Sequence, residues 1–186
     1  SDLAIAEWPT EHHGEKGRAD YVLFIGLMPV AAVEAKKMNT NVAGKIPQAG
    51  RYSKGFALSG LMVSPWVLEG RSSPWHDGQG EQYQLPYLYS CNGRPFVKQL
   101  AEQSGIWFRD ARHPSNLARA LQEFHSPDGL LDLLKRSREQ AEQTLKQEGF
   151  GYLKVRPYQQ KAIEAVESAL ERDQRDCLLA MATGTG

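Results

Sequence analysis

The stretch GRADYVLFIGLMPVAAVEAKK, residues 17–37, decides the fold. It contains two short apolar runs, YVLFI and VAAVEA, with GLMP between them. Both runs are too short for core helices, their composition suits strands, and Gly26 and Pro29 interrupt the apolar pattern. The stretch therefore predicts a buried β-hairpin. Its second strand ends in an acid and a base two residues apart, Glu34 and Lys36.

The turn of this hairpin sets which side chains meet at its open end. If residues 26–28 form the turn, Ile25 pairs with Pro29, and counting back places Asp20 opposite Glu34. A two-residue turn would shift the pairing by one residue and put the two carboxylates on opposite faces. Glu34 and Lys36 share a face in either case, because strand side chains alternate.

In the first register, two carboxylates and an ammonium group converge. Close carboxylates repel, and their burial is costly unless a cation neutralises them. A hard divalent ion with oxygen ligands, most simply Mg²⁺, suits such a pair, with Asp20 and Glu34 as its ligands. A nearby lysine can orient or deprotonate a water molecule and stabilise charge on a phosphate. The alternative is a hairpin that ends in a solvated charge cluster, since Glu-x-Lys is common by chance.

Outside this stretch the pattern divides the chain. Residues 1–60 are typical of strands, a hairpin and a following helix, and residues 61–70 predict another strand interrupted at Pro65. Helical apolar spacing over residues 128–150 predicts one connecting helix near a domain boundary. A further helix with Pro157 in its first turn and a short apolar strand, CLLAMA at residues 177–182, follow it.

The combination of Asp20 with Glu34-Ala35-Lys36 resembles the active-site signature of the PD-(D/E)xK nucleases, although Ala19 stands where a proline usually precedes the aspartate. This resemblance implies a mixed sheet flanked by helices, with Asp20 and Glu34 as metal ligands and Lys36 assisting the attacking water.

A second element follows it in the sequence. Gln48 and Tyr52 lie four residues apart, which puts them on one face if this stretch is helical. They resemble the Gln-x-x-x-Tyr extension of RecB-like nucleases and of type I restriction motor subunits, which implies that they position DNA. Arg51 and Lys54 beside them offer phosphate contacts.

Three residues upstream of the hairpin are candidates for the same centre. Glu7 occupies the approximate place of an accessory acid in the nuclease family. His12 and His13 could suggest metal binding. Adjacent histidines of an extended chain point to opposite faces, so we expect both to be loop residues.

The C-terminal segment RPYQQKAIEAV, residues 156–166, resembles the Q motif of superfamily 2 helicases, and MATGTG, residues 181–186, resembles the start of their phosphate loop. The resemblance implies an ATP site in the full-length protein in which Gln159 reads the adenine edge and loop amides cradle phosphates. Its residues are Arg156, Gln159, Thr183, Gly184, Thr185 and Gly186. The lysine that normally follows this loop lies outside the sequence, so we expect no ATP hydrolysis by this chain alone.

Together these features resemble the R (motor/endonuclease) subunit of type I restriction enzymes, as do LPYLYSCNGRPF and WFRDARHPSNL. The fold class is α/β. The resemblance divides the chain into a nuclease domain at 1–127, a connecting helix at 128–150 and the first elements of a RecA-like helicase domain at 151–186. It implies Mg²⁺-dependent cleavage of double-stranded DNA, coupled in the full-length protein to ATP-driven translocation, with modification (methyltransferase) and specificity subunits as partners.

Composition sets outer bounds on these expectations. Of the 186 residues, 22 are Lys or Arg and 22 are Asp or Glu, so any basic DNA-binding surface has to be local. Two distant cysteines, Cys91 and Cys177, suit a reducing compartment. No apolar run approaches the ~18 residues of a membrane span. We expect a cytoplasmic protein without a membrane partner, and a chain that is a piece of something longer.

Two alternatives stay open at this point. One is a RecB-like DNA repair helicase-nuclease, which partner genes for methylation and specificity would argue against. The other belongs to a different class: a catalytically inactive DNA-binding or scaffolding module that kept the nuclease fold. A cleavage assay with Mg²⁺ separates that module from both enzymes.

Overall fold

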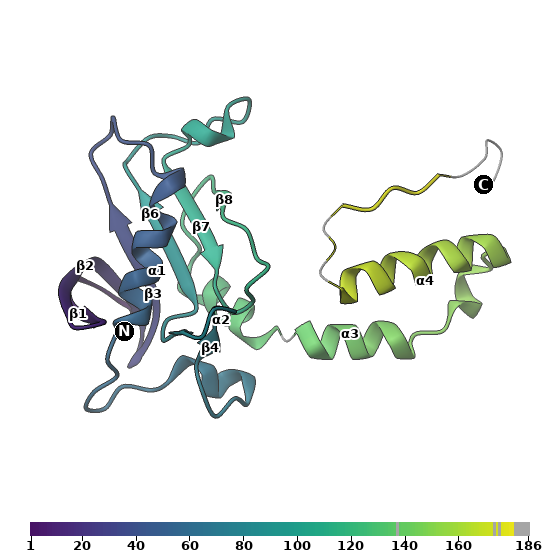
Figure 1. Cartoon of the computed structure of the whole chain (residues 1–186), viewed down its shortest axis with the longest axis horizontal. Coiled ribbons are helices and arrows are strands. Elements are labelled where there is room, and N and C mark those ends of the chain that lie inside the picture. Colours follow the sequence, from purple (N-terminus) through teal and green to yellow (C-terminus); the bar gives the residue numbers. More distant parts are fainter. Residues whose placement is uncertain (137, 173, 175, 181–186) are drawn as a thin grey trace. The chain divides into compact units, whose positions relative to one another are not determined.

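The computed structural model describes residues 1–136, 138–172, 174 and 176–180 of the chain. The chain divides into two compact units, Ser1–Lys135 and Arg136–Gly186 (Figure 1). The first unit contains the mixed sheet, and the second is helical. The fold is therefore mixed α/β, as the sequence predicts.

Six strands form the main sheet of unit 1. In spatial order they are β1 (Leu3–His12), β2 (Glu15–Ile25), β3 (Met28–Ala35), β6 (Tyr87–Cys91), β7 (Ile106–Asp110) and β8 (Arg119–Ala120). The pairing of β3 with β6 is parallel, and the other pairings are antiparallel. A separate two-stranded ribbon pairs β4 (Trp75–His76) with β5 (Gln82–Tyr83).

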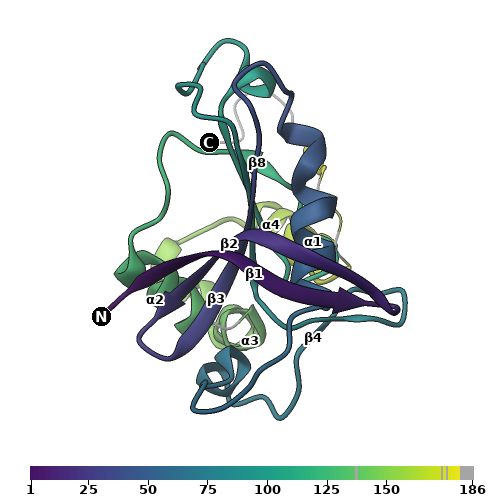
Figure 2. The ribbon, with the colours of Figure 1, turned by 90° about the vertical axis from the view of Figure 1, so that its left-hand side faces the viewer.

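Helices cover both faces of this sheet (Figure 2). On one face α1 (Ile46–Lys54) packs with Ile46 and Ala49 on Leu88, and with Tyr52 on Ala32. The other face carries α2 (Pro127–Lys135) over the core that Tyr87, Tyr89 and Phe108 form. Short 3-10 helices η1 (Ala43–Lys45), η2 (Pro65–Glu69) and η3 (Ala101–Gln103) lie in the connections.

The hairpin of β2 and β3 differs from the expected one in its turn. Ile25 pairs with Met28 across a two-residue turn whose first residue, Gly26, has the left-handed φ of 59° that such turns favour. The expected pairing of Ile25 with Pro29 is therefore wrong. A β-bulge compensates, because Leu23 pairs with Ala31 while Phe24 pairs with Pro29, which leaves Val30 as the extra residue. The bulge restores the register that places Asp20 level with Glu34.

The strand expected over residues 61–70 is replaced by the 3-10 helix η2. Pro65 fixes a backbone angle that fits the first turn of a helix, and Gly70 ends the helix in a left-handed conformation with φ 71°. Trp66 of this helix packs edge-on against the buried Trp75 at 6.2 Å. The strand prediction for residues 61–70 was therefore wrong.

The stretch predicted as one connecting helix forms two helices, α2 and α3 (Arg138–Gln147), which belong to different units. In unit 2 a 3-10 helix, η4 (Phe150–Leu153), leads to α4 (Pro157–Glu171), and Lys146 of α3 pairs with Glu171 of α4 at 3.0 Å. Residues 177–180 form no strand, because the described part of unit 2 supplies none for them to pair with. The rest of that predicted strand and the glycine-rich loop lie outside the described residues. Within the described ranges, every helix is too short or too polar to cross a membrane.

Candidate active site

Asp20, Glu34 and Lys36 meet at the open end of the β2–β3 hairpin. The ladder pairs Tyr21 with Val33, so the next step places Asp20 opposite Glu34. The carboxylate oxygen Oδ2 of Asp20 accepts a hydrogen bond from the Ala35 amide at 2.7 Å. The Nζ atom of Lys36 forms an ion pair with Oε1 of Glu34. The residues that the sequence singled out are thus neighbours in space.

Glu34 is the most unusual group of this centre. Its side chain is 0% exposed, and neither carboxylate oxygen has a hydrogen-bond partner among the described residues. A buried carboxylate without hydrogen bonds costs several kcal/mol unless a cation compensates it. Lys36 supplies one positive charge, and its own side chain is 30% exposed. Asp20 and Glu34 together carry two negative charges against this single positive charge, so a second cation beside them would be stabilised.

Helix α1 brings Gln48 and Tyr52 to the face of the sheet on which Glu34 lies. One helical turn separates them, and Nε2 of Gln48 donates to the Tyr52 hydroxyl at 2.8 Å. Burial raises the pKa of Tyr52 to about 12, and the carboxylates of Glu34 and Asp20 act in the same direction. The phenol is therefore neutral at physiological pH and keeps its own proton to donate.

Two residues of β6 lie next to this centre, although no sequence motif predicts them there. The parallel pairing sets Ser90 beside Glu34 and Cys91 beside Ala35. Burial raises the pKa of the Cys91 thiol, and the charges of Asp20 and Glu34 raise it further. No motif marks these residues, since only the pairing of β3 with a strand about fifty residues later brings them there.

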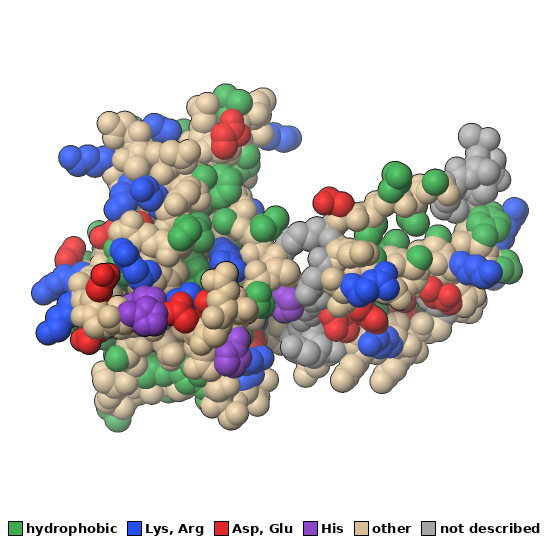
Figure 3. Space-filling model, viewed as in Figure 1, with side chains coloured by type: hydrophobic (Ala, Val, Ile, Leu, Met, Phe, Trp, Pro, Cys, Tyr) green, Lys and Arg blue, Asp and Glu red, His purple; other side chains and the backbone are tan. Residues whose placement is uncertain are grey.

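Two further candidate residues of unit 1, Glu7 and Arg51, are exposed. Glu7 is exposed and lies at the register position opposite Asp20 on β1, with a left-handed φ of 55°. Arg51 is exposed and lines a cavity of about 100 Å³ together with Tyr52 and Lys16. Figure 3 shows basic side chains on the side of unit 1 where β1 and β2 lie, interspersed with acidic ones.

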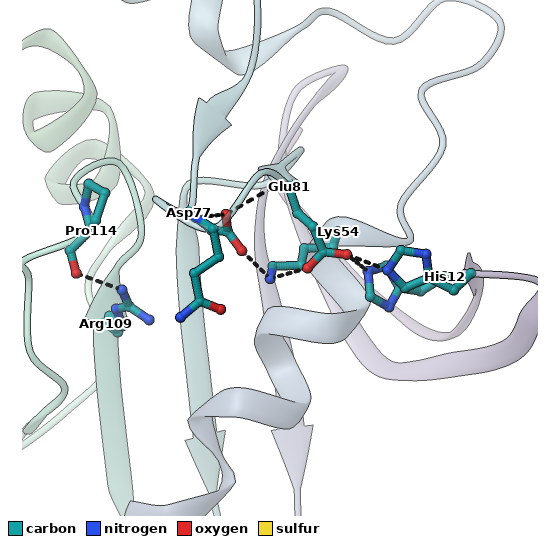
Figure 4. A network of polar contacts seen from close by, with 8 residues as sticks. His12, Lys54, Asp77, Glu81, Arg109 and Pro114 are labelled. Carbon is teal, nitrogen blue, oxygen red and sulfur yellow. Dashed lines mark hydrogen bonds and ion pairs between the residues drawn. The ribbon is translucent and has the colours of Figure 1, made fainter.

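Lys54 is placed differently from the expectation that it contacts phosphate. Its Nζ atom forms ion pairs with Oδ2 of Asp77 and Oε2 of Glu81, both at 2.6 Å (Figure 4). These two carboxylates already neutralise its charge, and its side chain is only 15% exposed. Lys54 thus attaches the β4–β5 ribbon to α1.

The expectation that His12 and His13 point to opposite faces is wrong. His12 ends β1, but His13 lies in the two-residue turn before β2 and has a left-handed φ of 52°. Strand alternation no longer applies there, and both imidazoles reach Glu81. His13 is thus a turn residue, as expected, and His12 is not.

In unit 2, Gln159 caps the first turn of α4. Its Oε1 atom accepts a hydrogen bond from the Arg156 amide at 2.8 Å. The phosphate-loop candidates Thr183, Gly184, Thr185 and Gly186 lie outside the described residues.

Comparisons with known proteins identify the family of this chain. Residues 1–134 match a family model described as "Type I restriction enzyme EcoKI endonuclease subunit second domain", and residues 152–186 match one described as "Type III restriction enzyme, res subunit". The type I restriction enzyme EcoKI endonuclease subunit of Escherichia coli (strain K12) is 42% identical over 198 residues, which cover 98% of this chain and 17% of that protein. No solved structure matches the chain. The match over residues 1–134 and the 42% identity show that the chain belongs to the family of type I restriction enzyme endonuclease subunits.

Proposed function

We propose that unit 1 is a PD-(D/E)xK nuclease domain that hydrolyses phosphodiester bonds of double-stranded DNA with the help of Mg²⁺. The observation that carries the proposal is Glu34, a fully buried carboxylate without hydrogen bonds that stands level with Asp20 and is paired with Lys36. A fold does not keep such a group for stability, because a neutral side chain of the same shape would be cheaper to bury.

The donor set fits a hard divalent ion. Asp20 and Glu34 offer carboxylate oxygens from adjacent strands, which are the ligands that Mg²⁺ prefers. The Ala35 amide holds the carboxylate of Asp20 in place, and both oxygens of Glu34 are free of hydrogen bonds among the described residues. When bound there, the ion would polarise the scissile phosphate and lower the pKa of a coordinated water.

The chain's own side chains complete the chemistry. Lys36 lies beside Glu34 and would orient the attacking water and stabilise negative charge that develops on the phosphate. Tyr52 receives a hydrogen bond from Gln48 and lies close enough to Glu34 for that carboxylate to raise its pKa, so its phenol belongs to the same centre and would contact a phosphate of the DNA there. Arg51, exposed on the same helix, supplies a positive charge for the DNA backbone. Glu7 would act as an accessory acid from β1.

The wider role concerns a longer protein, since the chain spans 17% of the length of the curated relative it matches. We infer that cleavage is coupled there to ATP-driven DNA translocation, with Arg156 and Gln159 at the entrance of the motor domain. The match of residues 152–186 to a restriction-enzyme res subunit supports this inference. Modification and specificity subunits would supply recognition of the DNA sequence.

A single isosteric change tests the nuclease assignment. In the complete subunit assembled with its partners, Glu34→Gln should reduce Mg²⁺-dependent DNA cleavage by about 100-fold or more, while ATP hydrolysis stays unchanged. The change removes a buried charge without hydrogen bonds, and its partner Lys36 is 30% exposed and can be hydrated, so the thermal midpoint of the 186-residue chain should be no lower than that of the parent.

The control is Glu123→Gln, which neutralises an exposed carboxylate of the same unit and should leave cleavage unchanged. Full cleavage by Glu34→Gln would show that the hairpin merely ends in a charge cluster. A parent protein that binds DNA but never cleaves it would instead support an inactive binding module.

A further inference from the structure

A second group of metal-ligand side chains lies in unit 1, built from residues that the proposed nuclease mechanism does not use. His12 and His13 both direct Nε2 at Oε1 of Glu81, at 2.7 Å and 2.5 Å (Figure 4). One ligand atom from each of the three residues lies within 4.8 Å of the other two. His12 is the last residue of β1, His13 lies in the turn that follows it, and Glu81 lies in the loop before β5, far away in sequence.

We propose that His12, His13 and Glu81 form a zinc site that joins the β1–β2 turn to the β4–β5 ribbon. Two imidazole nitrogens and one carboxylate oxygen are a donor set that zinc accepts readily and Mg²⁺ does not prefer. In a tetrahedral zinc site with bonds of 2.0–2.1 Å, the ligand atoms lie about 3.3 Å apart. The Nε2 atoms of His12 and His13 lie closer than that to Oε1 of Glu81, at 2.7 Å and 2.5 Å, so an ion between them would replace these two hydrogen bonds and move the side chains slightly apart.

The exposure of the three residues sets the kind of site. The side chain of His13 is 75% exposed, that of His12 22% and that of Glu81 30%. Solvent therefore has access, and a water molecule can occupy the fourth position. A site of three protein ligands and one water is weaker than a closed site of four protein ligands. We expect a dissociation constant near the micromolar range rather than the far tighter values of zinc fingers.

The turn explains why two adjacent residues can serve one ion. His13 and Gly14 have φ values of 52° and 79°, as both central residues of a tight two-residue hairpin turn require. A β-strand would send the two imidazoles to opposite faces. The left-handed backbone at His13 instead turns its ring back beside that of His12, with ring centroids 4.1 Å apart.

Glu81 is held in the orientation that a ligand needs. Its other oxygen, Oε2, accepts from Nζ of Lys54 at 2.6 Å, and Lys54 also binds Asp77. The Oδ1 atom of Asp77 in turn accepts hydrogen bonds from the backbone amides of Gln79 and Glu81, at 2.7 Å and 3.0 Å. Outer contacts of this kind orient the first ligands of metal sites.

The charges around the site also favour a cation. The Oε2 atom of Glu81 forms an ion pair with Nζ of Lys54 at 2.6 Å, and Oδ2 of Asp77 pairs with the same Nζ atom. Asp77 and Glu81 carry two negative charges against the single positive charge of Lys54. The cluster therefore has one net negative charge before any imidazole is protonated, and a divalent ion compensates it.

Zinc titration of the 186-residue chain, purified without a histidine tag, tests the proposal by competition with a chromophoric chelator. We expect one equivalent of zinc per chain and a tetrahedral absorption spectrum when Co²⁺ replaces it. At about 100-fold excess of zinc over the dissociation constant, the thermal midpoint should rise by about 5 °C. A parent chain that takes up no zinc at micromolar concentration would show that the cluster is only a set of hydrogen-bonded ion pairs.

Two variants remove ligands while keeping the fold. His13→Asn preserves a residue that tolerates a left-handed backbone, and Glu81→Gln preserves the shape of the side chain. Each should weaken zinc binding by about 100-fold and abolish the rise in thermal midpoint, with an unchanged far-UV circular dichroism spectrum. Undiminished zinc binding by both variants would overturn the proposal.

Two matched controls exclude other zinc positions. His76→Ala removes an exposed imidazole outside the cluster and should leave zinc binding unchanged. Glu34→Gln should also leave it unchanged, because the proposed nuclease centre uses other residues. Loss of zinc binding in either control would place the ion elsewhere and refute the three-residue site. The outcome for Glu34→Gln separates this proposal from the fate of the nuclease assignment.

Discussion

Two buried polar side chains of unit 1 differ in how well the fold satisfies them. Ser53 is 0% exposed, donates from Oγ to the Leu85 carbonyl at 2.8 Å and accepts from the Leu85 amide at 2.9 Å. Glu34 is equally buried, but its oxygens have no hydrogen-bond partner among the described residues. The hydroxyl of Ser53 thus supports the structure, whereas the carboxylate of Glu34 is compensated only by the ion pair with Lys36, which fits the catalytic role proposed for it.

Replacing Ser53 shows the structural side of this contrast. Ser53→Ala leaves both backbone groups of Leu85 without their partner in the interior, so the free energy of unfolding should fall by about 2 kcal/mol. Urea denaturation followed by circular dichroism measures the difference. Ser59→Ala, at an exposed position, should change the free energy by less than about 0.5 kcal/mol. Equal stability of the Ser53 variant and the parent would contradict the role of this hydroxyl.

Sequence reasoning reached some residues of the site and missed others for a physical reason. Strand alternation and helical spacing are local rules, and they correctly grouped Glu34 with Lys36 and Gln48 with Tyr52. Lys54 follows no such rule, because its partners lie 23 and 27 residues further along the chain. A lysine beside a predicted DNA-binding face was therefore taken for a phosphate ligand, although two carboxylates already hold it.

At the scale of elements, the β2–β3 hairpin shows how two local features can cancel. The sequence indicates the strands but not the turn, and the two-residue turn at Gly26 alone would have put Asp20 and Glu34 on opposite faces. The bulge at Val30 adds the missing residue. The prediction that Asp20 lies opposite Glu34 was correct, although the turn on which it was based was wrong. The bulge itself was not predicted, because a bulge leaves no clear mark in a short apolar run. The parallel neighbour β6 was likewise invisible to local rules.

His125 links the start of α2 to the sheet and gives this contact a pH dependence. The Tyr89 hydroxyl and Nδ1 of His125 are 2.7 Å apart, and the ring packs on Phe108 with centroids 4.5 Å apart. Burial lowers the pKa of His125 below its ordinary value of 6.5, and Arg119 lowers it further. The folded state thus favours the neutral ring, so its contribution to stability is present above pH 6.5 and is lost as the pH falls through the lowered folded pKa.

The expected result is a steeper loss of stability on acidification in the parent than in His125→Gln. The glutamine keeps a hydrogen-bonding group near Tyr89 but cannot take up a proton. Urea denaturation of both proteins between pH 7.5 and pH 5 measures the two slopes. His76→Gln, at an exposed histidine, should retain the slope of the parent. Parallel curves for the parent and His125→Gln would show that this ring does not titrate differently in the folded state.

At the scale of the whole molecule, the apolar face of helix α2 packs within unit 1. Its apolar spacing predicts one buried face, but periodicity does not say which partner covers that face. The sequence placed residues 128–150 in a connecting helix after a nuclease domain ending at 127. In the structure, Leu130 and Leu134 of α2 are buried in the core of unit 1 with Tyr87, and α3 belongs to unit 2. The compact unit accordingly extends to Lys135.

Two truncations compare these boundaries directly. All members of the three core clusters of unit 1 lie within residues 1–135, so this fragment should unfold cooperatively with a thermal midpoint within about 2 °C of that of the nuclease unit in the 186-residue chain. The fragment 1–127 lacks Leu130 and Leu134, which are 3% and 0% exposed, and it also lacks the Leu130 carbonyl that accepts from Tyr87.

Burial of each leucine contributes about 2 kcal/mol, so the shorter fragment should lose about 4 kcal/mol of unfolding free energy and expose the sheet face that α2 covers. Differential scanning calorimetry and binding of a hydrophobic dye measure both effects. The replacement of Leu130 and Leu134 by alanine in fragment 1–135 serves as a matched control, because it removes the same contacts while keeping the chain length. If fragment 1–127 melted as sharply and as late as fragment 1–135, α2 would be a linker after all, and the nuclease unit would end where the sequence pattern placed its boundary.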